Sequence, residues 1–257
     1  MNLIVNADDF GMSHAVNTAI RDSFAKGLVS STTLLANMDG FSEAMEMILA
    51  GTIPRGCIGI HLNLFEGVPL TDAMRRNRLY CDADGKYRYL QGAIPFMAPA
   101  RIAGTVVYGE LKAQIEKILK VGVTPSHLDS HGHYHSNWFV QKTVIDLAHE
   151  FKIPFIRTSP NLSRRNLRKR LLNLIFNRKK RLQKSGVKKC DWMGNIEEIE
   201  INFPQLSGWC EMMVHPVYDT DGKIIDAEYR KPLDELLEFS RKTMRFSYSG
   251  VLTEPRF

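Results

Sequence analysis

Short apolar runs rich in β-branched residues alternate along this chain with longer stretches of helical period, and this alternation limits the folds open to it. Candidate strands are Leu3–Ala7, Thr32–Ala36, Ile58–Leu64, Ser126–Asp129, Phe155–Thr158, Glu211–Val214 and Arg245–Tyr248. Helices are expected from the N-cap Ser13 through Phe24, and at Phe41–Leu49, Val106–Lys120, Phe139–Phe151 and Leu233–Thr243. Strands that alternate with helices form βαβ units around a parallel sheet, so the sequence predicts the α/β class.

The length of 257 residues suits one domain, and no linker-like stretch divides the chain. This length favours a closed or nearly closed β/α barrel over an open doubly wound sheet. The first strand lacks a following G-x-G-x-x-G loop, so a dinucleotide site has no support. We see no secretory signal, no run of 18 apolar residues and no C-x-x-C pair among the four cysteines, and therefore expect a cytoplasmic protein.

The basic residues are concentrated in one segment, 163–189, which holds twelve Lys or Arg and no acid. The remaining 22 basic and 28 acidic residues leave the rest of the chain at about −6, so the net charge of +6 is not a property of the fold. The segment has apolar residues near helical spacing, and we predict a basic helical insertion. It could be a solvated helix with a lid role, a peripheral contact with anionic lipid at the inner face of the membrane, or a phosphate-backbone contact. Phe176 is its one aromatic residue, so no nucleic-acid partner is expected.

Acidic residues and histidines gather where the predicted strands end, which is where parallel β/α folds carry their functional side chains. Asp8 and Asp9 end the first strand, His61 lies near the end of the third, and His215 follows a late one. Two adjacent carboxylates repel, and a divalent ion bound by one of them removes the conflict and leaves the other free as a base. The alternatives are a solvated turn beside Gly11 for the aspartates and a hydrogen-bonded core residue for His61.

Histidines are densest between His127 and His135, where they alternate with other residues that include Asp129. An extended segment would project these alternate residues to one side, whereas a helix would place His131 and His135 on one face. Either geometry gathers imidazoles, and this favours a metal site over an incidental or pH-sensitive histidine-rich loop. Two imidazoles and a carboxylate leave positions open for water and substrate on a bound ion, which lowers the pKa of that water to about 7. No G-x-S-x-G motif is present, so serine or cysteine nucleophiles rank low.

Three motifs follow one another along the chain: Asn6–Gly11, Gly59–Asn63 with Gly67–Leu70, and Thr124–His131. Together they resemble the YdjC-like carbohydrate deacetylases, a family that includes chitooligosaccharide deacetylases. The resemblance runs from residue 2 to about 157 and resumes at 211–216. It implies a distorted β/α barrel of about seven strands, similar to polysaccharide deacetylases. It also implies a divalent ion, magnesium or zinc, and the removal of an acetyl group from an N-acetylated sugar.

The resemblance also assigns roles by motif. Asp9, His61 and His131 match the metal ligands, Asp8 matches the candidate base, and His215 is a candidate general acid. The family more often has glycine after the proline that follows this histidine, whereas this chain has Val217. Three residues are expected to contact the substrate: Asn63, Arg157 and Glu211. Two others, His127 and Asp129, are expected to support the ligand histidines. A surface ion pair is the alternative for the arginine.

Other functions remain open from the residues alone. The same ligand set would serve a metal-dependent hydrolase of a phosphoester or of a non-acetyl amide. A nucleic-acid-binding protein built on an inert barrel ranks lower, because its basic residues would need interleaved aromatics. A homodimer is compatible with the sequence.

Overall fold

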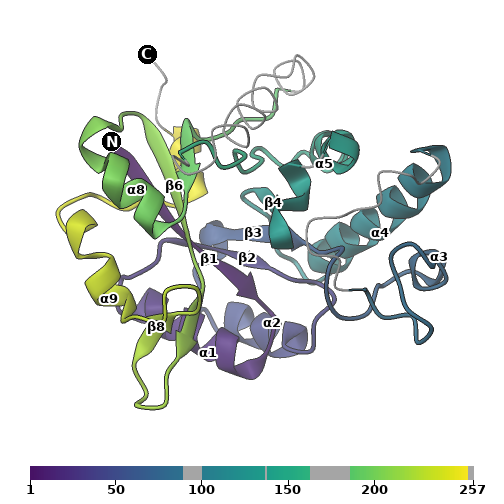
Figure 1. Cartoon of the computed structure of the whole chain (residues 1–257), viewed down its shortest axis with the longest axis horizontal. Coiled ribbons are helices and arrows are strands. Elements are labelled where there is room, and N and C mark those ends of the chain that lie inside the picture. Colours follow the sequence, from purple (N-terminus) through teal and green to yellow (C-terminus); the bar gives the residue numbers. More distant parts are fainter. Residues whose placement is uncertain (89–99, 137, 163–185, 254–257) are drawn as a thin grey trace.

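Six parallel strands form the central sheet of the computed structural model, which describes residues 1–88, 100–136, 138–162 and 186–253 (Figure 1). Their spatial order is β4-β3-β2-β1-β6-β5. The strands are β1 Asn2–Phe10, β2 Ser31–Leu34, β3 Ile58–Leu62, β4 Leu128–Ser130, β5 Trp192–Gly194 and β6 Trp209–Val214. Nearly all of their residues are buried, as expected for a parallel sheet covered on both faces. The predicted α/β class is confirmed.

The chain beyond β4 extends the curled sheet toward β5 without forming a continuous strand. Leu128 N donates to Phe155 O at 2.9 Å, and Arg157 N donates to Leu128 O at 2.9 Å. On the other side, Lys188 N donates to Pro154 O at 2.8 Å, just before the chain enters β5. The predicted strand at 155–158 is therefore present as isolated parallel bridges, in the position that a seventh strand of a β/α barrel would take. The predicted strand at 245–248 is likewise reduced to one parallel bridge, between Arg245 and Leu3.

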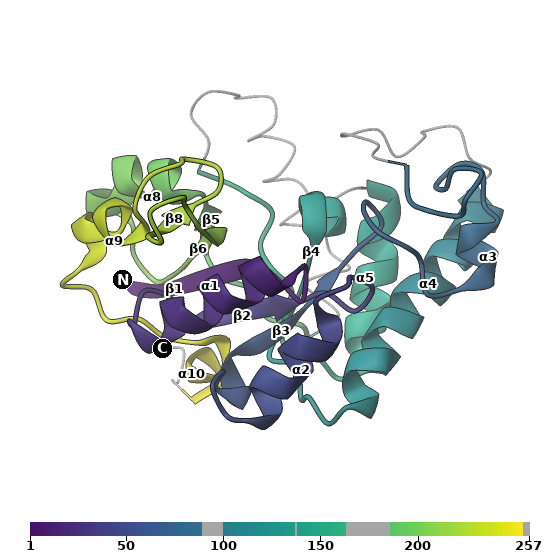
Figure 2. The same cartoon turned by 90° about the horizontal axis from the view of Figure 1, so that it is seen from below.

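Four longer helices connect the first strands and lie outside the sheet (Figures 1 and 2). They are α1 His14–Ala25, α2 Phe41–Leu49, α4 Ala100–Lys120 and α5 Trp138–Glu150. The bounds of α1, α2 and α5 lie within one residue of the predicted ones, whereas α4 ends as predicted but begins six residues earlier. Ser13 caps α1 as predicted, because its side chain accepts a hydrogen bond from Val16 N. The predicted helix at 233–243 is wrong in its length: the structure has α9 Leu233–Leu236 and a 3₁₀ turn, Glu238–Ser240. The Ser240 hydroxyl donates to Leu237 O, a local bond that competes with helix continuation.

Several shorter elements were not predicted. They are α3 Asp72–Arg75, α8 Ile196–Asn202, α10 Tyr248–Thr253, the strand β5, the antiparallel pair β7 Pro216–Tyr218 and β8 Ile224–Asp226, and 3₁₀ turns at Arg55–Cys57, His131–Ser136 and Phe203–Gln205. Strands of three residues are too short to show a periodicity. The start of α8 could have been predicted from the sequence, because Asn195 and Glu198 have the spacing of a capping box and form one in the structure.

Two expectations from the sequence concern the basic segment and membrane-spanning helices. Most of the basic insertion expected at 163–189 lies outside the described residues, which resume at 186. Within the described ranges, no helix combines the length and the apolar character that crossing a bilayer requires.

Candidate active site

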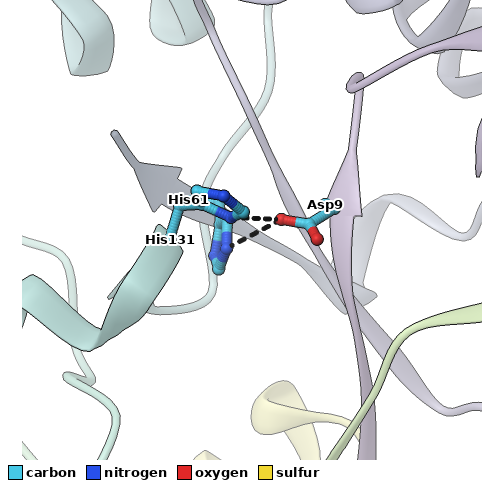
Figure 3. Close-up of side chains that lie close together, drawn as sticks. All are labelled: Asp9, His61 and His131. Atoms are coloured by element: carbon cyan, nitrogen blue, oxygen red, sulfur yellow. Dashed lines mark hydrogen bonds and ion pairs between the residues drawn. The ribbon is translucent and has the colours of Figure 1, made fainter. Parts of the chain in front are cut away.

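Asp9, His61 and His131 converge at the carboxyl ends of β1, β3 and β4, three strands of the same parallel sheet (Figure 3). Asp9 is near the end of β1, His61 is in β3, and His131 directly follows β4. Asp9 Oδ1 lies 2.7 Å from His131 Nδ1 and 3.2 Å from His61 Nε2. One donor atom from each residue can be chosen so that all three lie within 4.8 Å of one another. The structure thus brings together the three residues that the sequence analysis grouped.

The backbone of Asp9 explains how adjacent aspartates both face this site. Asp9 has φ 72°, in the left-handed region, and the register of β1 against β2 shifts between Ala7 and Phe10. In a regular strand Asp8 and Asp9 would point to opposite faces. A left-handed residue other than glycine costs roughly 1–2 kcal/mol, and such strain is most often found at functional sites.

A buried carboxylate fixes the orientation of His61. Its Nδ1 lies 2.6 Å from Asp129 Oδ1 and 3.1 Å from Thr33 Oγ1, so Nε2 faces Asp9. Burial alone would lower the pKa of His61, but the charge and hydrogen bond of Asp129 raise it to about 10. Asp129 thus lies behind His61, and a carboxylate in that position commonly supports a metal-binding imidazole.

The donor set and its exposure suit a divalent ion. One carboxylate oxygen and two imidazole nitrogens are the ligands of many open zinc and related sites. The side chain of His61 is only 1% exposed, whereas those of Asp9 and His131 are 15% and 17% exposed. The cluster is therefore held rigidly on one side and is open to water and a substrate on the other.

Asp8 belongs to a second, fully buried network centred on Arg157. The Arg157 guanidinium donates to both oxygens of Asp8, at 2.6 and 2.7 Å, and through Nε to Glu211 Oε1 at 2.6 Å. It also pairs with Asp129 Oδ2 at 2.8 Å, which links this network to His61. Burial would raise the pKa of Asp8, but the charge and hydrogen bonds of Arg157 outweigh it and hold that pKa well below its usual range. Asp8 is therefore ionised and fixed in orientation.

The three residues predicted to contact a substrate lie too deep for that role. The Arg157 guanidinium is paired with carboxylates of the protein, one of which belongs to Glu211. Glu211 also accepts a hydrogen bond from Tyr248 Oη. Burial raises the pKa of the Glu211 carboxyl to about 7 despite the neighbouring guanidinium. Asn63 is fully buried and binds the backbone of the loop that follows it. Direct contact of these residues with a substrate does not fit their positions, because all three are buried and engaged within the protein.

His127 has other neighbours than those predicted. It is fully buried, its ring stacks on Tyr248 at 3.8 Å between centroids, and its Nδ1 lies 2.9 Å from Ser126 Oγ. Among the described residues it has no hydrogen bond to His61 or His131, the two histidines that it was predicted to support. Gly59 makes room for the ring, because a Cβ at that position would lie 2.3 Å from it.

The histidines after His131 follow neither predicted geometry. The chain forms a 3₁₀ turn in which Gly132 and His133 are left-handed, so the alternate residues share no single side. His135 is buried with Nδ1 2.9 Å from Ser130 Oγ. Burial and then the charge of Arg157 lower the pKa of His133 to about 3.

His215 lies between β6 and β7, near the buried network. Its backbone N donates to Asp226 Oδ2 at 2.8 Å, and its carbonyl accepts from Ala227 N at 2.8 Å. Its charge contributes to lowering the pKa of Asp8, so it lies within electrostatic reach of the predicted base. The side chain is partly exposed.

Two residues that the sequence analysis did not single out also adjoin the site. Glu66 Oε2 lies 3.6 Å from His131 Nε2, and Tyr248 contacts both Glu211 and His127. Glu66 lies between Gly59–Asn63 and Gly67–Leu70, the two parts of one motif, and this position is the one feature of the sequence that could have indicated it. Tyr248 had no such signal, because its contacts join parts of the chain that are remote in sequence.

Comparison with known proteins identifies a family and a fold that match this chain. The family model described as "YdjC-like protein" matches residues 2–256. A carbohydrate deacetylase of Halalkalibacterium halodurans is 33% identical over 221 residues, 85% of this chain and 86% of the relative. A carbohydrate deacetylase of Thermoanaerobacter pseudethanolicus is 30% identical over 227 residues, 88% and 85% of the two chains. A crystal structure from Enterococcus faecalis V583, provisionally named a cellobiose-phosphate cleavage protein, aligns with a TM-score of 0.71 over 97% of this chain and 98% of the other. Its 24% identity supports the fold alone.

Proposed function

Because this chain belongs to the YdjC-like protein family, we propose that it is a metal-dependent hydrolase that removes an acetyl group from an N-acetylated sugar. The observation that carries the proposal is the convergence of Asp9, His61 and His131, with the ionised Asp8 beside them. The names of the two similar deacetylases supply the substrate class, and the site supplies the chemistry.

In this proposal Asp9, His61 and His131 hold the ion, magnesium or zinc. When bound there, a divalent ion lowers the pKa of water from 15.7 toward about 7 and polarises the amide carbonyl. His61 offers Nε2 because Asp129 occupies its other nitrogen. A proton and the ion compete for that nitrogen, so ion binding should release protons.

Asp8 would accept the proton of the attacking water. Arg157 keeps this carboxylate ionised and fixes both of its oxygens, and Asn6 Nδ2 donates to Oδ1 at 2.8 Å. Such a weak base can act only on water that is itself made acidic, which is consistent with an ion in the adjacent cluster. His215 would donate a proton to the departing amine, since it is partly exposed and within electrostatic reach of Asp8.

The buried network favours a neutral amide over a phosphoester. A phosphoester site needs cations that are free to bind phosphate oxygens. Among the described residues, Arg157 is the cation that adjoins this site, and it is committed to Asp8, Asp129 and Glu211. A further carboxylate, that of Glu66, lies beside His131 and would repel a phosphate.

The test compares metal content and acetate release for the native chain and His131→Ala. We expect the variant to lose its bound ion and at least about 100-fold in acetate release from N-acetylglucosamine oligomers, because a ligand has been removed. His149→Ala is the control, since this histidine is exposed in the last turn of α5. A His131→Ala variant that keeps both properties would show that the metal assignment is wrong. A native chain that cleaves phosphoesters but releases no acetate would show that the substrate class is wrong.

A further inference from the structure

The loop that follows β3, residues 63–71, carries an aromatic ring and a carboxylate to the mouth of the candidate metal cluster. The Phe65 ring meets the His131 ring edge to face, with centroids 5.4 Å apart. Glu66 Oε2 lies 3.6 Å from His131 Nε2, and its side chain is 46% exposed where that of His131 is 17% exposed. The two side chains therefore lie between the cluster and solvent.

Two buried polar side chains of α4 hold both ends of this loop. Glu110 accepts hydrogen bonds from the N atoms of Leu70 and Thr71, at 2.9 and 2.8 Å, and from the Thr71 hydroxyl at 2.7 Å. Gln114 accepts from Asn63 N at 2.9 Å and donates to Asn63 O at 2.7 Å. Both side chains are fully buried. Burying such groups is costly unless they are hydrogen-bonded, and here their partners include the backbone of this loop.

The tip of the loop is fixed from within. Asn63 Oδ1 accepts from the N atoms of Phe65 and Glu66, at 2.8 and 3.1 Å, and Asn63 Nδ2 donates to Glu66 O at 2.9 Å. Asn37 Nδ2 donates to the same carbonyl at 3.2 Å. The backbone of Glu66 is thus held by three hydrogen bonds and that of Phe65 by one, all from the two asparagines, while the Glu66 side chain stays 46% exposed. A group placed in this way is preorganised for a ligand.

The Glu66 carboxylate has little to bind within the protein. In the described ranges of the chain, His131 is its one ion-pair partner, at the long distance of 3.6 Å. An ionised carboxylate can accept several hydrogen bonds, and two hydroxyl groups on neighbouring carbons are suitable donors. The Phe65 ring adds apolar surface beside it. A pyranose ring presents both features, hydroxyl donors at its edge and C–H groups on its faces.

We propose that Phe65 and Glu66 form the subsite for the sugar ring that bears the acetamide, with Glu66 accepting hydrogen bonds from ring hydroxyls and Phe65 packing against its C–H face. This inference rests on the proposed deacetylation. It narrows the substrate, because a carboxylate at this place disfavours a phosphate or carboxylate group on the same ring.

The experiment measures steady-state acetate release from the N-acetylglucosamine disaccharide by the native chain, Glu66→Ala and Glu66→Gln. The control is Glu46→Gln, an exposed glutamate of α2. Losing hydrogen bonds to a charged acceptor should raise KM roughly 10- to 100-fold in Glu66→Ala, with kcat changed only a few-fold. Glu66→Gln should raise KM less, and it should also improve the ratio of kcat/KM for N-acetylglucosamine 6-phosphate over N-acetylglucosamine. A merely structural residue would not change that ratio.

Other results would overturn the inference. An unchanged KM in Glu66→Ala excludes recognition by Glu66, and a loss of metal equal to that of His131→Ala makes Glu66 a ligand instead. If the native chain releases no acetate, the proposed function fails by itself. Calorimetric titration with the same disaccharide then tests the subsite: the Kd should rise by a similar factor in Glu66→Ala, and absence of binding by the native chain refutes the subsite.

Discussion

Replacing Arg157 with methionine should strongly destabilise the protein, because it removes the counter-charge of three buried carboxylates. The guanidinium is fully buried and makes four contacts of 2.6–2.8 Å, two with Asp8 and one each with Asp129 and Glu211. Methionine fills part of the volume but donates no hydrogen bond. The carboxylates would then be buried without this counter-charge, keeping only their contacts with Asn6, His61 and Tyr248, or would have to bind protons.

The size of the effect follows from the number of buried carboxylates that lose the guanidinium. Removing one member of a buried ion pair typically costs about 3–5 kcal/mol. With three carboxylates affected we expect a loss of roughly 4–6 kcal/mol, which is a large part of the 5–15 kcal/mol that stabilises an ordinary domain. At about 2–4 °C per kcal/mol for a chain of this size, Tm should fall by roughly 10–20 °C. Arg157→Lys should lose about half as much, since it keeps the charge without the planar fork of donors.

The loss should also depend on pH, with a defined sign. In the native chain the folded pKa of Asp8 is depressed, so Asp8 contributes stability above about pH 4 that is lost as the pH falls further. In the variant, burial without the guanidinium raises the pKa of Asp8, so the folded variant takes up a proton more easily than the unfolded one. The difference in unfolding free energy between the two proteins should therefore shrink from pH 8 to pH 5.

Urea unfolding at both pH values measures this difference. Arg241→Met is the control, because that side chain is 78% exposed and should change stability by less than about 0.5 kcal/mol. The reasoning is refuted if Arg157→Met loses less than about 1 kcal/mol, or if its loss grows on acidification.

Three further outcomes are expected. Gly59→Ala should lower the free energy of unfolding by at least about 2 kcal/mol, because its Cβ would lie 2.3 Å from the His127 ring. Gly109→Ala, on the open side of α4, should raise it by about 0.5–1 kcal/mol, and thermal unfolding of the two variants compares them. The folded pKa of Glu211 is raised to about 7, so the native chain should lose stability as the pH rises from about 4.5 to 7, and Glu211→Gln should lack that slope in urea unfolding at several pH values. A chelator should lower the Tm of the native chain, and added zinc or magnesium should restore it, whereas His131→Ala should respond to neither; equal responses would contradict the ligand assignment.

Elements with a long periodic signal were predicted well from the sequence. The helices α1, α2 and α5 lie within one residue of their expected bounds and α4 ends where expected, because an amphipathic stretch of nine or more residues can bury its apolar face in only one way. Short strands were missed, and the segment 155–158 pairs only through isolated bridges. Their pairing depends on neighbours from remote parts of the chain, which local sequence does not specify.

The sequence by itself determined which side chains gather at the site. Asp9 and His61 lie near the ends of β1 and β3, and His131 directly follows β4; the carboxyl ends of the strands of one parallel sheet lie along the same edge. The tertiary structure alone decided what each nearby polar group does. Arg157, Glu211 and Asn63 are buried there as supports, and Glu66 lies exposed beside His131. Burial and hydrogen-bond partners set these roles, and both come from residues far away in the chain that only the completed fold brings into contact.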